Sequence, residues 1–248
     1  MKLKELTAKT SLKAIGQRIG LDLKPQDDFF LPSMKMVEAC RADDFDFFQP
    51  FIDAGKLTVE QMHRAAARYH LGKTKSGQPI FWMIDDNLDP LDAHIVPDTW
   101  ISTLLKRREP MLEYWYFDSC LFGLHLLKAE VGCKRDEVNS SVCIVESERS
   151  AVVLSELFPN ALWLASSGLQ MFSVEMFQPL TDYKVVIFPD TDVSGDTYRQ
   201  WQAIAQEAQK RFPFRYPLRV SALLESHATP EQKQRKIDIA DFLLADLA

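Results

Sequence analysis

The chain has 248 residues, of which 46% are hydrophobic, 26% charged and 11% aromatic, and its 9 glycines and 13 prolines are too few for a disordered or collagen-like protein. A net charge of −6 excludes nucleic-acid binding as a simple polycation, but a local basic surface or a charge-offsetting metal ion stays open. The sequence has no apolar run of membrane-helix length, no signal-peptide block and no CxxC pair. We therefore expect a cytoplasmic protein with reduced thiols and no membrane partner.

Residues 1–117 are predicted to form a smaller α+β region, helical over 1–75 and rich in β-strand over 78–117. Thr58 and Gln61 form a capping-box pattern that predicts a helix start, and Gly72 is placed to end that helix. Two runs between residues 78 and 117 favour β-strands, namely Pro79–Asp85 and Tyr114–Phe117. Turn residues follow the first of them.

The densest basic cluster of the sequence is Lys106-Arg107-Arg108. A run of charges is usually a solvated face of a helix or loop. The cluster is nevertheless the best candidate in the sequence for contact with a phosphate backbone, because it places three cations side by side.

Residues 118–248 show short apolar runs that alternate with helical segments, which is typical of a parallel sheet covered by helices on both faces. This pattern predicts an α/β domain with about four parallel strands. The expected strands are Val142–Glu146, Ala161–Ala165, Tyr183–Phe188 and Leu218–Leu224. The expected helices are Ser150–Phe158, 173–179, 196–211 and Ile237–Leu244.

Acidic residues stand where two of these strands end. Glu146 ends the first strand, and Asp190 and Asp192 follow the third. Ligands of open α/β sheets bind at the carboxyl ends of the strands, and alternate residues of an extended segment project to the same side. Paired carboxylates of this kind suit Mg²⁺ or Mn²⁺. Gly195 then allows a ligand to approach the backbone closely at the start of the following helix.

Each of these acids also has a purely structural interpretation. An Asp in the turn after a strand is commonly a turn residue or an N-cap. Glu148 could share the site or stabilise the first turn of the following helix, and Arg149 could contact a phosphate or pair with Glu148. The simplest interpretation of Asp238 and Asp241 is that their negative charges stabilise the first turn of the last helix through the helix dipole.

The combination of a strand-end Glu, a Ser-Ser-Gly loop and a strand-end DxDxxG resembles the Toprim domain of topoisomerases, bacterial primases and some nucleases. The matching segments here are Ile144-Val-Glu-Ser-Glu-Arg-Ser-Ala151, Ala165-Ser-Ser-Gly168 and Phe188-Pro-Asp-Thr-Asp-Val-Ser-Gly195. Upstream, Cys120-Leu-Phe-Gly-Leu-His-Leu-Leu127 is similar to the short helix that precedes this domain in replicative primases, and the Asp-rich segment 238–243 resembles the helix that often closes it.

The likeness is closer to the primase-like Toprim proteins of Bacteroidetes mobile elements, and it covers about residues 60–245. It also includes Ile80-Phe-Trp-Met-Ile-Asp85 and Trp163-Leu-Ala-Ser-Ser-Gly-Leu169. The chain departs from these relatives in three respects. It shows no zinc-ribbon motif, Arg149 stands where they usually have Lys, and Ser167 replaces the first glycine of the loop.

The resemblance implies a Toprim-like Rossmannoid domain over 118–248 and Mg²⁺- or Mn²⁺-dependent, primase-like nucleotidyl transfer in DNA replication or mobile-element maintenance. It assigns metal binding and catalysis to Glu146, Asp190 and Asp192. Contacts with single-stranded DNA and nucleotides would come from Lys106, Arg107, Arg108 and Arg149, with a replicative helicase as a further candidate partner. Two alternatives stay open: a Toprim nuclease that uses the same acids, and a non-catalytic accessory protein that binds nucleic acid.

Overall fold

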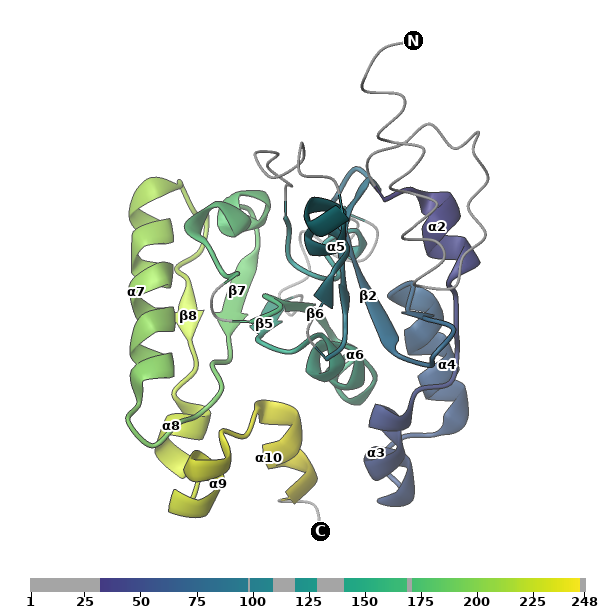
Figure 1. The fold of residues 1–248 in the computed structure, drawn as a ribbon. Coiled ribbons are helices and arrows are strands. Elements are labelled where there is room, and N and C mark those ends of the chain that lie inside the picture. The colour runs from purple at the N-terminus through teal and green to yellow at the C-terminus, as the bar shows by residue number, and fades with distance from the viewer. Residues whose placement is uncertain (1–31, 98, 109–118, 129–140, 169–170, 246–248) are drawn as a thin grey trace.

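The computed structural model describes residues 32–97, 99–108, 119–128, 141–168 and 171–245. These residues form a mixed α/β protein with two four-stranded sheets, an antiparallel sheet in order β1-β2-β3-β4 and a parallel sheet in order β6-β5-β7-β8. The parallel sheet and α7 occupy the left of Figure 1, and the antiparallel sheet with α2 and α4 occupies the right.

The first part of the chain builds the antiparallel sheet and the helices around it. Its strands are β1 Gly72–Lys73, β2 Pro79–Ile84, β3 Pro90–Ile95 and β4 Thr99–Trp100. Its helices are α2 Met34–Ala39, α3 Gln49–Asp53, α4 Val59–Arg68 and α5 Ile101–Arg108, with a 3-10 turn η1 at Asp46–Phe48.

The second part of the chain builds the parallel sheet. Its strands are β5 Ser141–Val145, β6 Ala161–Ala165, β7 Lys184–Ile187 and β8 Arg219–Val220. Its helices are α6 Glu148–Leu157, α7 Asp196–Arg211, α8 Leu223–His227, α9 Pro230–Arg235 and α10 Ile239–Ala245, with a 3-10 helix η5 at Val174–Leu180. The predicted four-stranded parallel sheet is therefore confirmed, with a shorter last strand than expected.

The two parts share one apolar core. Strand β2 alternates its side chains, so that Phe81 and Met83 join the large core built with β5, β6 and α6, while Trp82 faces a smaller core with α2 and α5. Tyr69 at the end of α4 donates a hydrogen bond of 2.8 Å to the carbonyl of Trp163 in β6. The regions that the sequence separates at residue 117 are thus packed together through buried side chains.

Several local predictions can be compared with the structure. Helix α4 begins at the predicted capping box, in which Gln61 N donates to Thr58 Oγ1 at 3.2 Å. The expected role of Gly72 as the end of this helix is wrong, because the helix ends at Arg68 and Gly72 lies in β1. His70, with a φ of 52°, makes the reversal instead. The predicted strand at 114–117 lies outside the described residues.

Two segments of the second part take other conformations than expected. The expected helix in Cys120–Leu127 begins only at Leu126, and the residues before it form a bridge and a turn, because Phe122 pairs with Ala165 at the end of β6 and Gly123 has a φ of 84°. The predicted helix at 173–179 is the 3-10 helix η5, which contains Pro179. Among the described residues, no helix has the length and apolar character needed to span a bilayer.

Candidate functional site

The structure brings Glu146 and Asp190 to the same edge of the parallel sheet. β5 and β7 are neighbouring parallel strands that pair Ile144 with Ile187, and Phe188 N donates to the Ile144 carbonyl at 2.8 Å. Glu146 is the first residue after β5, and Asp190 follows the end of β7 by three residues. Both acids therefore lie at the carboxyl ends of adjacent strands, which is where open α/β sheets bind ligands.

Asp190 has the most unusual surroundings of these acids. Its Oδ1 atom is buried and has no hydrogen-bond partner among the described residues. Burial raises the pKa of Asp190 well above its ordinary value, and three neighbouring negative charges raise it further: those of Glu146, Asp238 and Asp241. Buried polar atoms almost always have a partner, so this oxygen marks a position where a cation, a proton or a water would be stabilised.

Asp238 and Asp241 reach this edge from the start of α10. Thr191 N donates to the Ile237 carbonyl at 3.1 Å, which joins the segment after β7 to the residues before α10. Asp238 accepts hydrogen bonds from Ser150 Oγ of α6 and from Asp241 N, the latter at 2.8 Å. Asp238 therefore caps α10, as the sequence indicated, and it also places a negative charge near Asp190.

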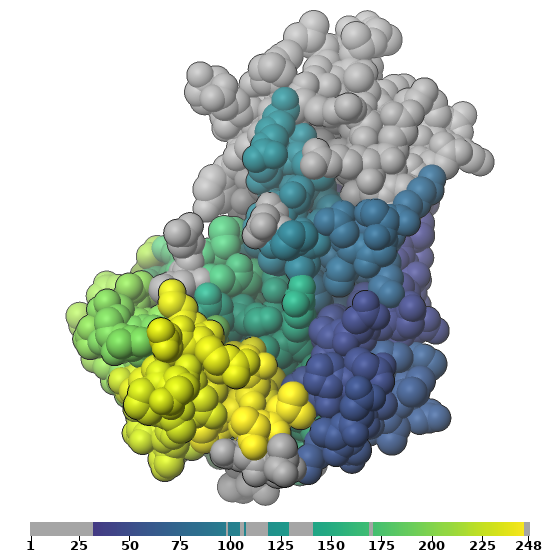
Figure 2. Space-filling view, turned by 60° about the horizontal axis from the view of Figure 1, so that its bottom comes forward, coloured from purple at the N-terminus to yellow at the C-terminus, as the bar shows by residue number. Residues whose placement is uncertain are grey.

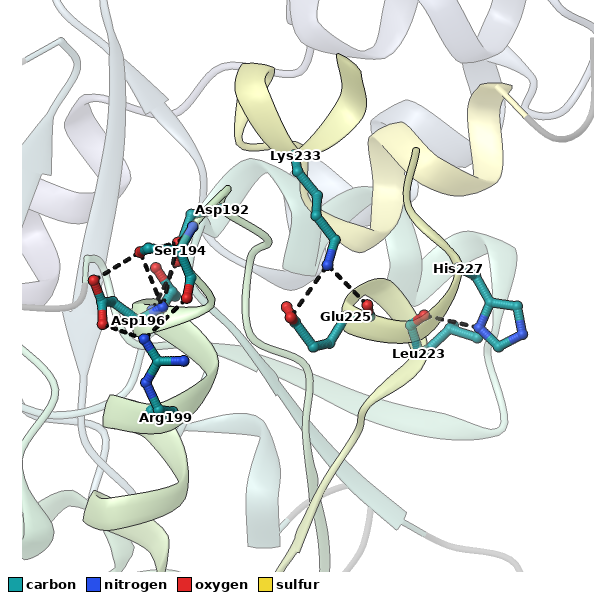
Figure 3. A network of polar contacts seen from close by, with 9 residues as sticks. Asp192, Ser194, Asp196, Arg199, Leu223, Glu225, His227 and Lys233 are labelled. Carbon is teal, nitrogen blue, oxygen red and sulfur yellow. Dashed lines mark hydrogen bonds and ion pairs between the residues drawn. The ribbon is translucent and has the colours of Figure 1, made fainter. Parts of the chain in front are cut away.

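Asp192 has a different role from Asp190. Its Oδ1 accepts hydrogen bonds from Ser194 N at 2.7 Å and Ser194 Oγ at 2.6 Å, and its Oδ2 accepts one from Thr197 N at 2.8 Å (Figure 3). Burial alone would raise the pKa of Asp192, but these hydrogen bonds outweigh burial and lower it. Asp192 is thus an ionised cap at the N-terminus of α7.

The segment from Pro189 to Gly195 is not a strand, and this explains the difference between the two aspartates. The rule that alternate residues share a side holds only for extended backbone. Gly195, with a φ of 71°, makes the turn into α7. A Cβ atom at Gly195 would lie 3.1 Å from Glu225 Oε1 and 3.2 Å from Arg199 Nη1, so these two side chains fill the space that the sequence assigned to a ligand.

The acids form a loose group rather than a preformed metal centre. Within the residues that the structure describes, no three Asp, Glu, His or Cys side chains are close enough to hold a metal ion together. Mg²⁺ is commonly held by only one or two carboxylates together with waters and substrate phosphates. Asp190, with its unpartnered buried oxygen, and Glu146 fit this mode of binding.

Two more buried oxygens near this edge have no partner among the described residues. They are Ser166 Oγ, directly after β6, and Thr191 Oγ1, between the two aspartates. The Ser-Ser-Gly loop is recognisable in the sequence, but nothing there assigns a role to the hydroxyl of Ser166 or of Thr191. No local pattern points to Ser150 either, because its contact with Asp238 spans 88 residues.

The structure gives Glu148 a partner that neither earlier interpretation named. Glu148 is buried in the first turn of α6, and its Oε1 lies 2.8 Å from His94 Nδ1 of β3. Burial alone would lower the pKa of His94, but the interaction with Glu148 outweighs it and raises the pKa. The His94 ring also stacks on Trp100 of β4 with centroids 4.9 Å apart. The contact between His94 and Glu148 therefore joins the antiparallel sheet to α6, two residues after Glu146.

The predicted nucleic-acid contacts are placed only in part. Arg149 is exposed near the start of α6. Arg107 is exposed on α5, and the side chains of Lys106 and Arg108 lie outside what the structure describes. Figure 2 shows the face of the molecule on which α8, α9 and α10 (yellow) lie in front.

A comparison with protein-family models finds a match over more than half of the chain. A family model described as "Domain of unknown function (DUF6371)" matches residues 47–191, which include Glu146 and Asp190 and end before Asp192. A search of the curated proteins finds no match. Because the family model covers more than half of the chain, this protein belongs to the DUF6371 family.

Proposed function

We propose that this protein is a Toprim-like, Mg²⁺- or Mn²⁺-dependent phosphoryl-transfer protein that acts on DNA by primase-like nucleotidyl transfer. One observation carries the proposal: the buried Oδ1 of Asp190, which has no hydrogen-bond partner in the described part of the chain, shares the carboxyl edge of β5 and β7 with Glu146. The Toprim resemblance assigns the reaction to a Glu after the first strand and to two Asp residues after the third, and the shared edge of Glu146 and Asp190 supports the Glu and the first Asp of that set.

Asp190 and Glu146 are the residues that would hold the ion in this proposal. A bound divalent ion supplies charge neutralisation at the phosphate and orients the attacking and leaving oxygens. Asp238 and Asp241 add negative charge near Asp190, which favours a cation there over an anion. The hydrogen bonds of Asp192 to the start of α7 hold the loop that carries Asp190.

The test is an incubation of the full chain with single-stranded DNA, nucleoside triphosphates and Mg²⁺ or Mn²⁺. Asp190→Asn and Glu146→Gln are the informative variants. Asp43→Asn is the matched control, because Asp43 is exposed and forms no hydrogen bond or ion pair with the described residues. We expect new oligonucleotides with the wild type and the control, and none with the two site variants.

Binding of Mn²⁺ alone, followed by electron paramagnetic resonance, separates the metal site from the reaction. We expect each site variant to weaken Mn²⁺ binding by about tenfold or more, since it removes one of two charged ligands. If the DNA is shortened and no new oligonucleotides form, the reaction at the same acids is hydrolysis and not nucleotidyl transfer. The absence of both a reaction and Mn²⁺ binding would refute the proposal and leave an accessory role.

A further inference from the structure

The segment that runs from the end of α7 to the start of β8 is basic, although the chain as a whole has a net negative charge. Residues 210–219 read Lys-Arg-Phe-Pro-Phe-Arg-Tyr-Pro-Leu-Arg and contain no acidic residue. Aromatic residues alternate with the cations, which is the composition of surfaces that bind single-stranded nucleic acids. We call residues 211–219 the arginine strip.

The arginine strip presents its cations to solvent. Its odd-numbered residues, including Arg211, Arg215 and Arg219, are exposed, and its even-numbered residues are half-buried. Phe214 packs edge-on against Phe177 of η5 with ring centroids 6.4 Å apart, and Arg215 N donates to the Thr181 carbonyl at 2.8 Å. The half-buried side therefore anchors the strip, and this leaves the arginines on the outside.

Within the described residues, two of these arginines lack a carboxylate partner. Arg211 pairs with Glu175, whereas Arg215 and Arg219 form no ion pair with any residue in the described part of the chain. The guanidinium of Arg215 lies 5.4 Å from the centre of the Tyr216 ring, and Lys184 Nζ lies 5.5 Å from the same centre. Tyr216 thus holds two cations together by cation–π contacts.

The strip leads toward the candidate site. β8 is one of the two edge strands of the parallel sheet, and its Arg219 pairs with Val186 of β7. Ser221 N then donates to the Ile187 carbonyl at 2.8 Å, three residues before Asp190. In Figure 1, β8 and α7 lie side by side at the left of the molecule, and the chain continues from β8 into α8 at the bottom.

We propose that the arginine strip binds the phosphate backbone of a single-stranded nucleic acid along the β8 edge of the sheet. Arg215 and Arg219 contact phosphates directly in this arrangement, and Tyr216 positions Arg215 and Lys184. The choice of a nucleic acid as ligand rests on the proposed function, but binding by the strip requires neither a metal ion nor the acids of the site.

The experiment measures the affinity of the full chain for a fluorescent oligothymidylate by anisotropy over a series of salt concentrations, without divalent ions. Arg215→Gln/Arg219→Gln removes the two unpaired cations. We expect weaker binding and a slope of log K against log salt that is smaller by about 1.4, since each phosphate contact on a single strand contributes about 0.7. Arg215→Lys/Arg219→Lys should retain most of the slope.

Lys75→Gln/Lys128→Gln is the control for charge alone, because both lysines are exposed and lie outside the strip. An equal change of slope in this control, or no change in the strip variant, would overturn the proposal. Stronger binding of poly-glutamate than of oligothymidylate would also overturn it, since the surface would then suit an acidic protein.

Asp190→Asn separates this inference from the proposed function. This variant removes a residue of the proposed metal site and leaves every residue of the strip unchanged. If the strip variant loses its slope and no metal-dependent reaction occurs, the strip proposal holds and the proposed function fails. If the reaction depends on Asp190 and the strip variant binds like the wild type, the strip proposal fails alone.

Discussion

Gly123 provides the sharpest test of how the chain before β5 is fixed against the parallel sheet. It has a φ of 84°, and a Cβ atom there would lie 2.9 Å from Tyr69 Cε1, 3.2 Å from Leu164 Cδ2 and 3.3 Å from the Trp163 carbonyl oxygen. The neighbouring Phe122 exchanges two backbone hydrogen bonds with Ala165, of 2.9 and 3.1 Å. Gly123→Ala must therefore disturb the strand end that leads to Ser166.

The expected loss of stability has two parts. A left-handed conformation costs a residue other than glycine about 1–2 kcal/mol. Overpacking of a filled core costs about a further 1–3 kcal/mol, because the contacts to Tyr69 and Trp163 involve a buried ring and a backbone atom. We expect Gly123→Ala to lower the free energy of unfolding by about 2–5 kcal/mol.

Gly77→Ala is the matched control, since Gly77 has a φ of 83° and a Cβ atom there would meet no atom of residues 32–97, 99–108, 119–128, 141–168 or 171–245 within 4 Å. It should cost only the conformational part, about 1–2 kcal/mol. Urea denaturation followed by circular dichroism and tryptophan fluorescence measures both variants. Equal losses for the two substitutions would refute the claim that Gly123 is required by packing against β6.

Three further predictions concern other buried groups. Burial lowers the pKa of His125 to about 4. The free energy of unfolding should therefore fall as the pH drops from about 6.5 to 4, because the unfolded chain binds a proton there that the folded protein does not. Urea titrations of the wild type and of His125→Gln should differ by up to about 3 kcal/mol over this range. Arg64→Met should lower the midpoint of urea denaturation, because it leaves the buried Glu156 carboxylate unpaired, and Arg64→Met/Glu156→Gln should recover part of this loss. In a Cys133→Ser variant, the other thiols should react with Ellman's reagent only after unfolding, because burial raises their pKa values; fast reaction of the native protein would contradict their burial. These thiols are Cys40, Cys120 and Cys143.

Much of the second part of the fold could be predicted from the sequence. The strands of a parallel sheet are buried on both faces, so each appears as a short apolar run, and β6 has the predicted bounds. Helix α7 also has the predicted bounds, because Gly195 precedes it and its apolar residues recur with helical spacing. The loop at Cys120–Leu127 could not be predicted in this way, because its conformation depends on the pairing of Phe122 with Ala165.

The sequence by itself determined which acids follow the strands, since the position of a residue after an apolar run is a local property. Only the tertiary structure decided what each carboxylate contacts. Asp192 accepts hydrogen bonds from the start of α7, whereas Asp190 lies near the negative charges of Glu146 and of the acids at the start of α10. The surroundings of a side chain depend on elements that are distant in sequence, such as α6 and α10, which meet through Ser150 and Asp238. No local pattern records that packing, because it results from burying several apolar faces in one core.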